Sequence, residues 1–299
     1  MKKILLTIYY KLLDGYELTR VIKNKIISKL IKAPSVRTTD ETLAKIIKES
    51  YSISRFGDGE FALMNGKGIL FQPYHPELGR RLKEIIKSNQ EKHLVCIPNV
   101  FFTVEWCTEK AKKYWTKYLN NNRSDIYKKL DMKKEYYDAL VTRLYIDHKD
   151  KSITEKRFKI LKQLWENRHI VIVEGDKSRL GIGNDLFVNA LSIERILCPS
   201  INAFARYDEI LKEIKKHNKN KLILIALGPT ATVLSYDLLM MEYQALDIGH
   251  IDIEYEWFLK KAMEKVPVKN KYIGEIPNGT NIQGILDQRY KNEIIAKVM

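Results

Sequence analysis

The chain has 299 residues, of which 45% are hydrophobic and 30% are charged, a composition that allows a globular protein with a sizeable core. Its net charge of +15 favours an anionic partner, such as nucleic acid, anionic lipid or a phosphorylated substrate, without choosing among them. No apolar run has the length of a membrane span and no signal-peptide cleavage site follows the start, so we expect a cytoplasmic protein. Three isolated cysteines without zinc-ligand spacing are expected to be reduced thiols: Cys96, Cys107 and Cys198.

Residues 1–35 form a basic amphipathic segment. Apolar residues recur there at helical spacing, and the segment contains eight basic residues but only two acidic ones, Asp14 and Glu17. Such a segment can lie on an anionic membrane, which predicts peripheral contact at the inner face of the membrane through residues 1–32. The alternative is a helix packed on the body of the protein or on a second copy, which would make a homo-oligomer. Pro34 and Ser35 end the segment, and residues 36–299 are expected to form a single domain.

From residue 36 onward, predicted strands alternate with predicted helices. Thr38 and Glu41 have the spacing of a capping box before a helix through Glu49. Further helices are expected at 76–88, 104–118 and 155–165, the last after a second capping box that starts at Ser152, and a loop is expected at 120–124. Short apolar stretches predict strands at 51–56, 93–98, 139–146, 170–173, 195–198, 221–227 and 245–248. This alternation predicts an α/β, Rossmann-like fold: a mostly parallel sheet with helices on both faces.

Two carboxylates follow the first of these strands within the tetrapeptide 57–60. If the backbone there is extended, Asp58 and Glu60 project to the same side and repel each other unless a cation lies between them. A hard divalent ion, Mn²⁺ or Mg²⁺, would bridge these carboxylates to the phosphate oxygens of a nucleotide. Arg55 could bind the same phosphates. The alternative is a surface turn, since Gly-Asp-Gly is common turn chemistry.

Two later segments each present a strand followed by a glycine-containing turn and a predicted helix start. The first is the loop 174–185, in which Arg179 supplies a positive charge and a helix is expected to begin near Asn184 or Asp185. The second is Gly228, Pro229 and Thr230 after the strand 221–227. The N–H groups of a helix start bind phosphate well. Structural roles remain the alternative: a flexible loop with an N-cap for the first, close packing and a capping threonine for the second.

A fourth segment, residues 247–256, gathers acidic residues around one histidine. If it is extended, His250, Asp252 and Glu254 lie on one face; if it is helical, they spread around the cylinder. An extended start that becomes helical near Tyr255 is our expectation. His250 beside a carboxylate could then act as a general base or as an extra metal ligand.

Taken together, these segments resemble the GT-D type glycosyltransferases, bacterial enzymes with a Rossmann-like fold and an Asp-x-Glu metal motif. The matching stretches are 54–61, 173–187, 195–204, 227–238 and 246–257, and the resemblance runs from Tyr51 to Glu275. It implies a UDP-sugar donor, Mn²⁺ or Mg²⁺ held at Asp58 and Glu60, and a glycan acceptor, either a surface-polysaccharide precursor or a protein-linked glycan. A lipid-linked acceptor would suit the basic N-terminal segment.

Candidate residues for the reaction follow. If the anomeric configuration inverts, a base must take the proton of the acceptor hydroxyl, and the candidates are Asp252, Glu254 and His250. Contacts to the nucleotide sugar would come from Arg55, Phe56, Gly57, Arg179, Asn184, Asp185, Gly228, Pro229 and Thr230.

Two other functions are compatible with parts of the sequence. The first is another Rossmann-like nucleotide-dependent transferase or an oxidoreductase. The third small residue of the dinucleotide fingerprint is missing after Gly183, which counts against a nicotinamide enzyme. A basic nucleic-acid-binding protein is the other. It would explain the net charge but not the acidic groups of the first and fourth segments, which repel phosphate, so no nucleic-acid partner is expected.

Overall fold

A single parallel sheet organises the chain. The computed structural model describes residues 2–277, 279–280, 282, 284 and 287–299, and within that set the side chains of residues 15 onward. Nine strands pair in the order β1-β4-β3-β2-β8-β7-β5-β6-β9, and every pairing between them is parallel. The strands are β1 (Ser35–Val36), β2 (Ser52–Arg55), β3 (His93–Ile97), β4 (Glu135–Asp138), β5 (His169–Gly175), β6 (Ser192–Cys198), β7 (Leu222–Ala226), β8 (Ala245–Asp247) and β9 (Ile294–Lys297).

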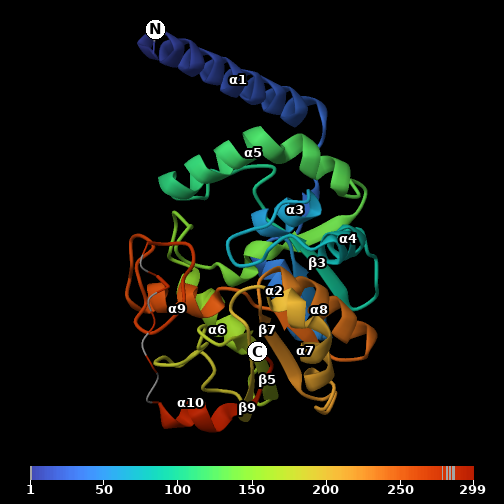
Figure 1. Cartoon of the computed structure of the whole chain (residues 1–299). Helices are drawn as coiled ribbons and strands as arrows, with labels where there is room; N and C mark the ends of the chain where they lie inside the picture. The colour runs from blue at the N-terminus through green and yellow to red at the C-terminus, as the bar shows by residue number, and fades with distance from the viewer. Residues whose placement is uncertain (1, 278, 281, 283, 285–286) are drawn as a thin grey trace.

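Helices cover both faces of this sheet (Figure 1). The helices α2 (Thr39–Glu49), α6 (Thr154–Lys162) and α9 (Ile251–Leu259) share a core with one face. The other face is covered by α4 (Pro76–Ile85), α7 (Tyr207–Ile214) and α8 (Pro229–Met240). The remaining helices are α1 (Lys2–Leu30), α3 (Asp58–Met64), α5 (Glu109–Lys129), α10 (Gln288–Glu293) and the 3₁₀ turns η1 (Ala139–Thr142) and η2 (Ala203–Arg206). The Rossmann-like α/β architecture expected from the sequence is therefore confirmed.

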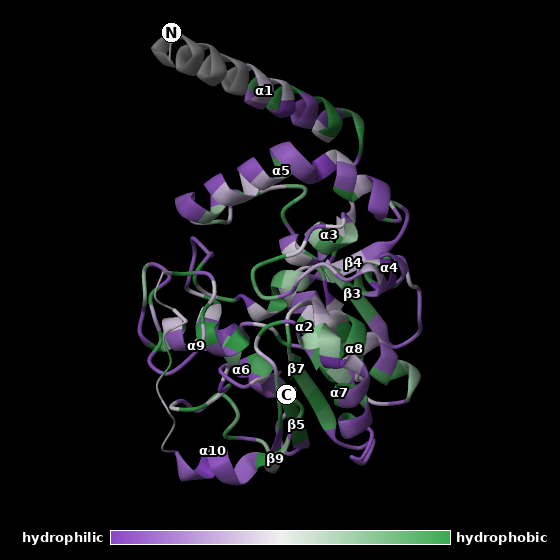
Figure 2. Cartoon of the chain, viewed as in Figure 1, coloured by the Kyte–Doolittle hydropathy of each residue, from purple (hydrophilic) through white to green (hydrophobic). Residues whose placement is uncertain are grey.

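The central strands are apolar at successive positions because the sheet is covered on both faces. In β5, Ile170 and Ile172 pack into the core on one face, whereas Val171 and Val173 pack into the core on the other. Because successive residues of a strand face opposite sides, a strand covered on both faces needs apolar residues at every position. Figure 2 shows β5 and β7 coloured hydrophobic, whereas α5 and α10 are mostly hydrophilic.

The helix α1 lies outside these layers and packs on α5 (Figure 1). The contact includes polar side chains, since Arg20 donates to Asn121 at 2.8 Å and Asn24 donates to Asn120 at 2.6 Å, and Ile27 packs against the apolar core beneath. None of the helices in the described residues has both the length and the apolarity that crossing a bilayer requires. The division into residues 1–35 and 36–299 stays a prediction.

Several predicted elements are confirmed and others are wrong. The capping box of α2 forms, with the Glu41 carboxylate 2.9 Å from the Thr38 amide. The box predicted at Ser152 does not form, because its amide donates to Asp150 and the N-cap of α6 is Ile153. The strand predicted at 139–146 is wrong, since β4 ends at 138 and η1 follows. The loop predicted at 120–124 lies inside α5, which starts later and runs further than expected. The three cysteines are buried and unbonded, as expected.

Candidate functional site

The acidic tetrapeptide lies at the carboxyl end of β2, where α3 begins. Gly57 is the N-cap of α3, and its amide donates to the Glu60 carboxylate at 2.7 Å. The condition of an extended backbone is therefore not met. Asp58 and Glu60 lie in the first turn of α3, where the side chains of residues two apart are about 200° apart around the helix. Asp58 is exposed and Glu60 is partly buried, so the two carboxylates differ in their access to solvent.

Two tyrosines of α5 face these carboxylates. The Tyr114 hydroxyl donates to the Asp58 carboxylate, and the rings of Tyr114 and Tyr118 stack with centroids 6.2 Å apart. Burial, and after it the negative charge of Asp58, raises the pKa of both hydroxyls. Tyr114 is therefore protonated at neutral pH and acts as a hydrogen-bond donor. This contact attaches Asp58 to α5, and the spacing of the tetrapeptide did not predict it.

Beside β2, Asp247 ends the neighbouring strand β8 and pairs with Arg55. The Arg55 guanidinium lies 2.8 Å from the Asp247 carboxylate and 2.8 Å from its main-chain oxygen, and it also donates to the Ala139 carbonyl at 3.2 Å. Arg55 thus ties β2, β8 and η1 together. Its predicted contact with donor phosphate stays a prediction, and its guanidinium already has three partners. The side chain of the adjacent Phe56 is fully buried in the core and is not accessible to a ligand.

Three carboxylates therefore gather at the carboxyl ends of β2 and β8. Burial, followed by the charges of Asp247 and Asp58, raises the pKa of Glu60 to about 7, although the Gly57 amide opposes this. The Asp247 pKa is also raised by burial, against the effect of Arg55. The negative charge here is only partly balanced by protein groups. Within the described part of the chain, no group of three or more His, Cys, Asp or Glu side chains is arranged to hold a metal by itself.

Gly249 makes room for the Arg55 guanidinium. Its φ is +45°, and a Cβ at this position would lie 1.9 Å from Arg55 Nη2. We expect Gly249→Ala to lower the free energy of unfolding by about 2–4 kcal/mol, because the methyl group both strains the backbone and displaces a buried ion pair. Chemical denaturation measures this loss.

Gly66→Ala is the matched control for that substitution. Gly66 also has a positive φ, +77°, but nothing lies within 4 Å of a Cβ there. The control should lose only about 1–2 kcal/mol from backbone strain. Equal losses in the two variants would mean that the contact with Arg55 adds nothing.

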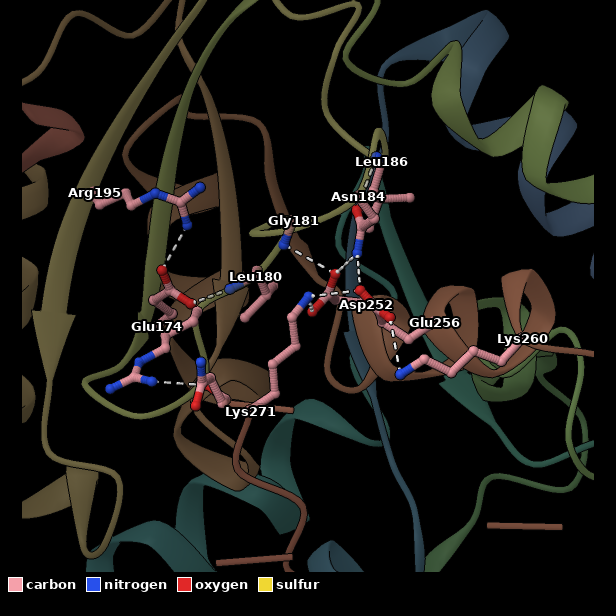
Figure 3. Close-up of polar contacts among 12 residues, drawn as sticks. Glu174, Leu180, Gly181, Asn184, Leu186, Arg195, Asp252, Glu256, Lys260 and Lys271 are labelled. Carbon is pink, nitrogen blue, oxygen red and sulfur yellow. Dashed lines mark hydrogen bonds and ion pairs between the residues drawn. The ribbon is translucent and has the colours of Figure 1, made fainter. Parts of the chain in front are cut away.

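The glycine-rich loop after β5 is held by α9 rather than followed by a helix. Residues 181–189 form turns, so the helix expected near Asp185 is absent and its phosphate-binding N-terminus with it. Instead, Asp252 at the start of α9 accepts the Gly181 amide at 2.9 Å and the Asn184 side chain at 2.8 Å (Figure 3). Asn184 also donates to Glu256 at 2.8 Å. The loop is thereby fixed against the helix by side chains that we expected to bind the donor or to act as the base.

The other charged residues of this loop also have protein partners. Arg179 is largely buried and donates to the Asn270 carbonyl at 3.0 Å. Asp185 is exposed and accepts from Lys162 at 2.7 Å and from the Tyr255 hydroxyl at 2.6 Å. Donor binding by Arg179, Asn184 and Asp185 stays a prediction, and it would require these contacts to be shared or broken.

A buried lysine from the C-terminal part of the chain completes this network. Lys271 lies 2.6 Å from Asp252 and 3.3 Å from Glu256, and its side chain is only 3% exposed (Figure 3). Lys260 neutralises the outer side of Glu256 at 3.4 Å. No motif pointed to Lys271, because its partners are 15 and 19 residues away in the sequence.

The three candidate bases do not share one face. The helix α9 begins at Ile251, so the expected extended start is wrong and His250, Asp252 and Glu254 spread around the helix. Glu254 is fully buried, accepts the amides of Tyr145 and Ile146 at 3.0 Å, and burial raises its pKa to about 7.

His250 has the most open position of the three. It is the N-cap residue of α9, its side chain is 32% exposed, and its Nε2 lies 3.5 Å from the Glu275 carboxylate. Burial lowers the pKa of His250 to about 4, with Glu275 opposing the shift, so the imidazole is neutral at neutral pH.

The helix start predicted after the strand 221–227 is confirmed, but other side chains pack over it. The chain passes from β7 through Gly228, with φ +53°, into α8, which begins at Pro229. A Cβ on Gly228 would lie 2.5 Å from the Phe71 ring, and the buried Thr230 hydroxyl lies 3.5 Å from the Gln72 side chain. Donor contacts by Gly228, Pro229 and Thr230 stay a prediction.

The family model of the glycosyltransferase GT-D fold matches residues 53–276, which include all of these segments. The chain belongs to the GT-D family. Two curated relatives support this: glycosyltransferase GlyD of Streptococcus pneumoniae, 41% identical over 95% of this chain, and a probable glycosyl transferase, Gly, of Streptococcus gordonii, 41% identical over 88%. This chain spans 35% and 39% of their lengths.

Solved structures agree with the GT-D assignment. A domain of unknown function 1792, described as having a distinct glycosyltransferase fold, superposes with a TM-score of 0.86 at 40% identity, covering 94% of this chain and 99% of that domain. Another, described as a new glycosyltransferase from Streptococcus sanguinis, gives a TM-score of 0.84 at 39% identity, covering 89% of this chain and 100% of that one. The family that the motifs resembled is therefore confirmed.

Proposed function

We propose that this GT-D chain is a metal-dependent glycosyltransferase that moves a sugar from a UDP-sugar donor to a glycan acceptor. The observation that carries the proposal is the group of carboxylates Asp58, Glu60 and Asp247 at the carboxyl edge of the parallel sheet. This edge is where α/β folds bind their ligands. Asp247 is paired with Arg55, whereas Asp58 and Glu60 have no ion-pair partner among the described side chains. These two carboxylates suit a cation that arrives with an anionic ligand better than they suit the ligand alone.

The residues present fit a Mn²⁺ or Mg²⁺ ion. Such ions are commonly held by one or two carboxylates together with substrate phosphates and water, so a third protein ligand is not needed. Asp58 and Glu60 would supply the carboxylates; burial first, and then the charges of Asp247 and Asp58, raises the pKa of Glu60 to about 7, and a cation would oppose this rise. When bound, the ion would offset the negative charge on the departing diphosphate.

The protein groups have separate tasks in this proposal. Tyr114 orients the Asp58 carboxylate through its hydroxyl, and the pairing of Arg55 with Asp247 fixes the ends of β2 and β8 beneath it. Of the three candidate bases, His250 has the geometry best suited to accept the proton of an acceptor hydroxyl. It is neutral and partly exposed, whereas Asp252 is saturated with donors and Glu254 is fully buried.

A thermal-shift panel tests the donor and metal assignments. UDP, several UDP-sugars and NAD are added to the full chain, each with Mn²⁺ or with excess chelator. We expect UDP with Mn²⁺ to stabilise the protein by about 2.7 kcal/mol at a ligand concentration 100 times its dissociation constant. The chelator should remove most of this stabilisation. Stabilisation by NAD, or by UDP to the same extent in chelator, would contradict the proposal.

A further inference from the structure

The described part of α1 exposes an apolar stripe. Leu18, Ile22, Ile26 and Leu30 follow each other at intervals of four residues, and their exposed fractions are 59%, 48%, 50% and 79%. Residues four apart lie on one side of a helix, so these side chains form a continuous strip along its surface. Thr19 and Lys23 border the same strip, which forms a shallow apolar hollow around Ile22 and Ile26.

This stripe faces away from the protein. Asn24 is bonded to Asn120 and accepts from Arg123 at 2.6 Å, so its side of α1 is turned toward α5. Asn24 lies two residues from both Ile22 and Ile26, and such neighbours are about 200° apart on a helix. The side chains of this stripe therefore point outward, whereas Asn24 faces α5 and Ile27, outside the stripe, packs against the core.

The charge around the stripe indicates what covers it. Residues 15–32 contain five basic residues and one acidic residue, Glu17. Lys23, Lys25 and Lys29 are exposed, and among the side chains that the structure describes they have no ion-pair partner. A second copy docked through the same stripe would place two equally basic surfaces next to each other, because an isologous contact uses the same patch of both subunits. A negatively charged surface would instead complement these lysines.

We propose that α1 docks on the surface of an anionic phospholipid bilayer, with the apolar stripe in the interface and the lysines at the lipid headgroups. An amphipathic helix with lysines beside its apolar face binds such surfaces by burying apolar side chains and by attracting the anionic headgroups. The helix lies in the membrane plane and does not span it. Because α1 packs on α5, and α5 carries Tyr114 to Asp58, docking also places the carboxylate cluster on the membrane side of the molecule. This last point alone rests on the proposed function.

Flotation of the full chain with lipid vesicles tests the proposal. We expect the chain to float with vesicles of phosphatidylglycerol and phosphatidylcholine, and not with vesicles of phosphatidylcholine alone. Replacing Lys23, Lys25 and Lys29 with Gln should lower the partition coefficient about fivefold for each lysine removed. Ile22→Ser together with Ile26→Ser should lower it at least about tenfold, because the apolar term is lost. All five positions are exposed, so the variants should fold normally.

Matched controls separate docking from the general positive charge. Lys212, Lys215 and Lys216 are exposed on or just after α7, and replacing them with Gln removes the same charge elsewhere. This triple variant should float like the parent. The proposal is overturned if the parent remains unbound, or if the control triple loses as much binding as the α1 triple. It is also overturned if the serine pair abolishes self-association in sedimentation while vesicle binding persists. None of these readouts needs a sugar donor, so they remain informative even if the proposed activity is wrong.

Discussion

Asp58→Asn is expected to lower turnover of the UDP-sugar donor about 10³-fold, which corresponds to about 4 kcal/mol of transition-state stabilisation. The amide keeps the shape of the side chain and can still accept from Tyr114, but it removes the charge that would hold the ion. Release of UDP, measured with the donor selected by the thermal-shift panel, gives the rate. The Mn²⁺-dependent thermal shift with UDP should disappear in the same variant.

Two further variants make this test sharper. Glu60→Gln retains an oxygen that can accept the Gly57 amide, so α3 should stay capped while the second carboxylate is lost. Asp208→Asn is the control, because Asp208 is an exposed acid in the first turn of α7, as Asp58 is in α3. It should leave turnover unchanged. Full activity of Asp58→Asn, or of the parent protein in excess chelator, would refute the metal assignment.

Arg195→Met is expected to lower the free energy of unfolding by about 3–5 kcal/mol. The Arg195 side chain is 1% exposed and lies 2.6 Å from Glu174, which is fully buried (Figure 3). It also lies 2.7 Å from Glu293. Removing the guanidinium leaves a carboxylate inside the core that, among the residues the structure describes, keeps only the Leu180 amide as a partner, at 2.7 Å. Arg206→Met, which breaks an exposed pair with Glu209, should cost no more than about 1 kcal/mol.

The loss of unfolding free energy in Arg195→Met should also depend on pH. Burial already raises the pKa of Glu174 above its usual value, against the effect of Arg195, and the variant should raise it further. A folded state that binds this proton more tightly than the unfolded state loses stability as pH rises from the unfolded pKa to the folded one. The difference between parent and variant should therefore be larger at about pH 8 than at about pH 5. Adding Glu174→Gln should recover part of the stability at the higher pH. A loss that is independent of pH would exclude a stranded carboxylate as its cause.

Local sequence patterns predicted the elements whose stability comes from local interactions. The alternation of apolar strands and helices predicted the parallel sheet, because β5 and its neighbours must be apolar on both sides. The capping box at Thr38 formed, since its two residues satisfy each other. The similar pattern at Ser152 failed because the Ser152 amide, which the box would have used, donates to the Asp150 carboxylate instead.

Where the sequence predicted the wrong local structure, contacts between distant segments determine the conformation. Asn120 and Asn121 suggest a loop, yet they lie within α5, where α1 bonds to both of them. Tertiary contact overrides weak helix propensity here. The glycine-rich loop after β5 suggested a helix start. Its conformation depends instead on Asp252 and Lys271, whose positions no local pattern reveals.

The parallel sheet has an electrostatic consequence for the acidic cluster. Because all the strands run in one direction, α3, α8 and α9 begin at the same edge of the sheet, at Asp58, Pro229 and Ile251. The amino end of a helix carries roughly half a positive elementary charge, so several such ends partly balance the carboxylates without any ion. We therefore expect the apo-protein to remain folded. The cation would then bind together with a ligand to a protein that is already folded, and folding would not require it.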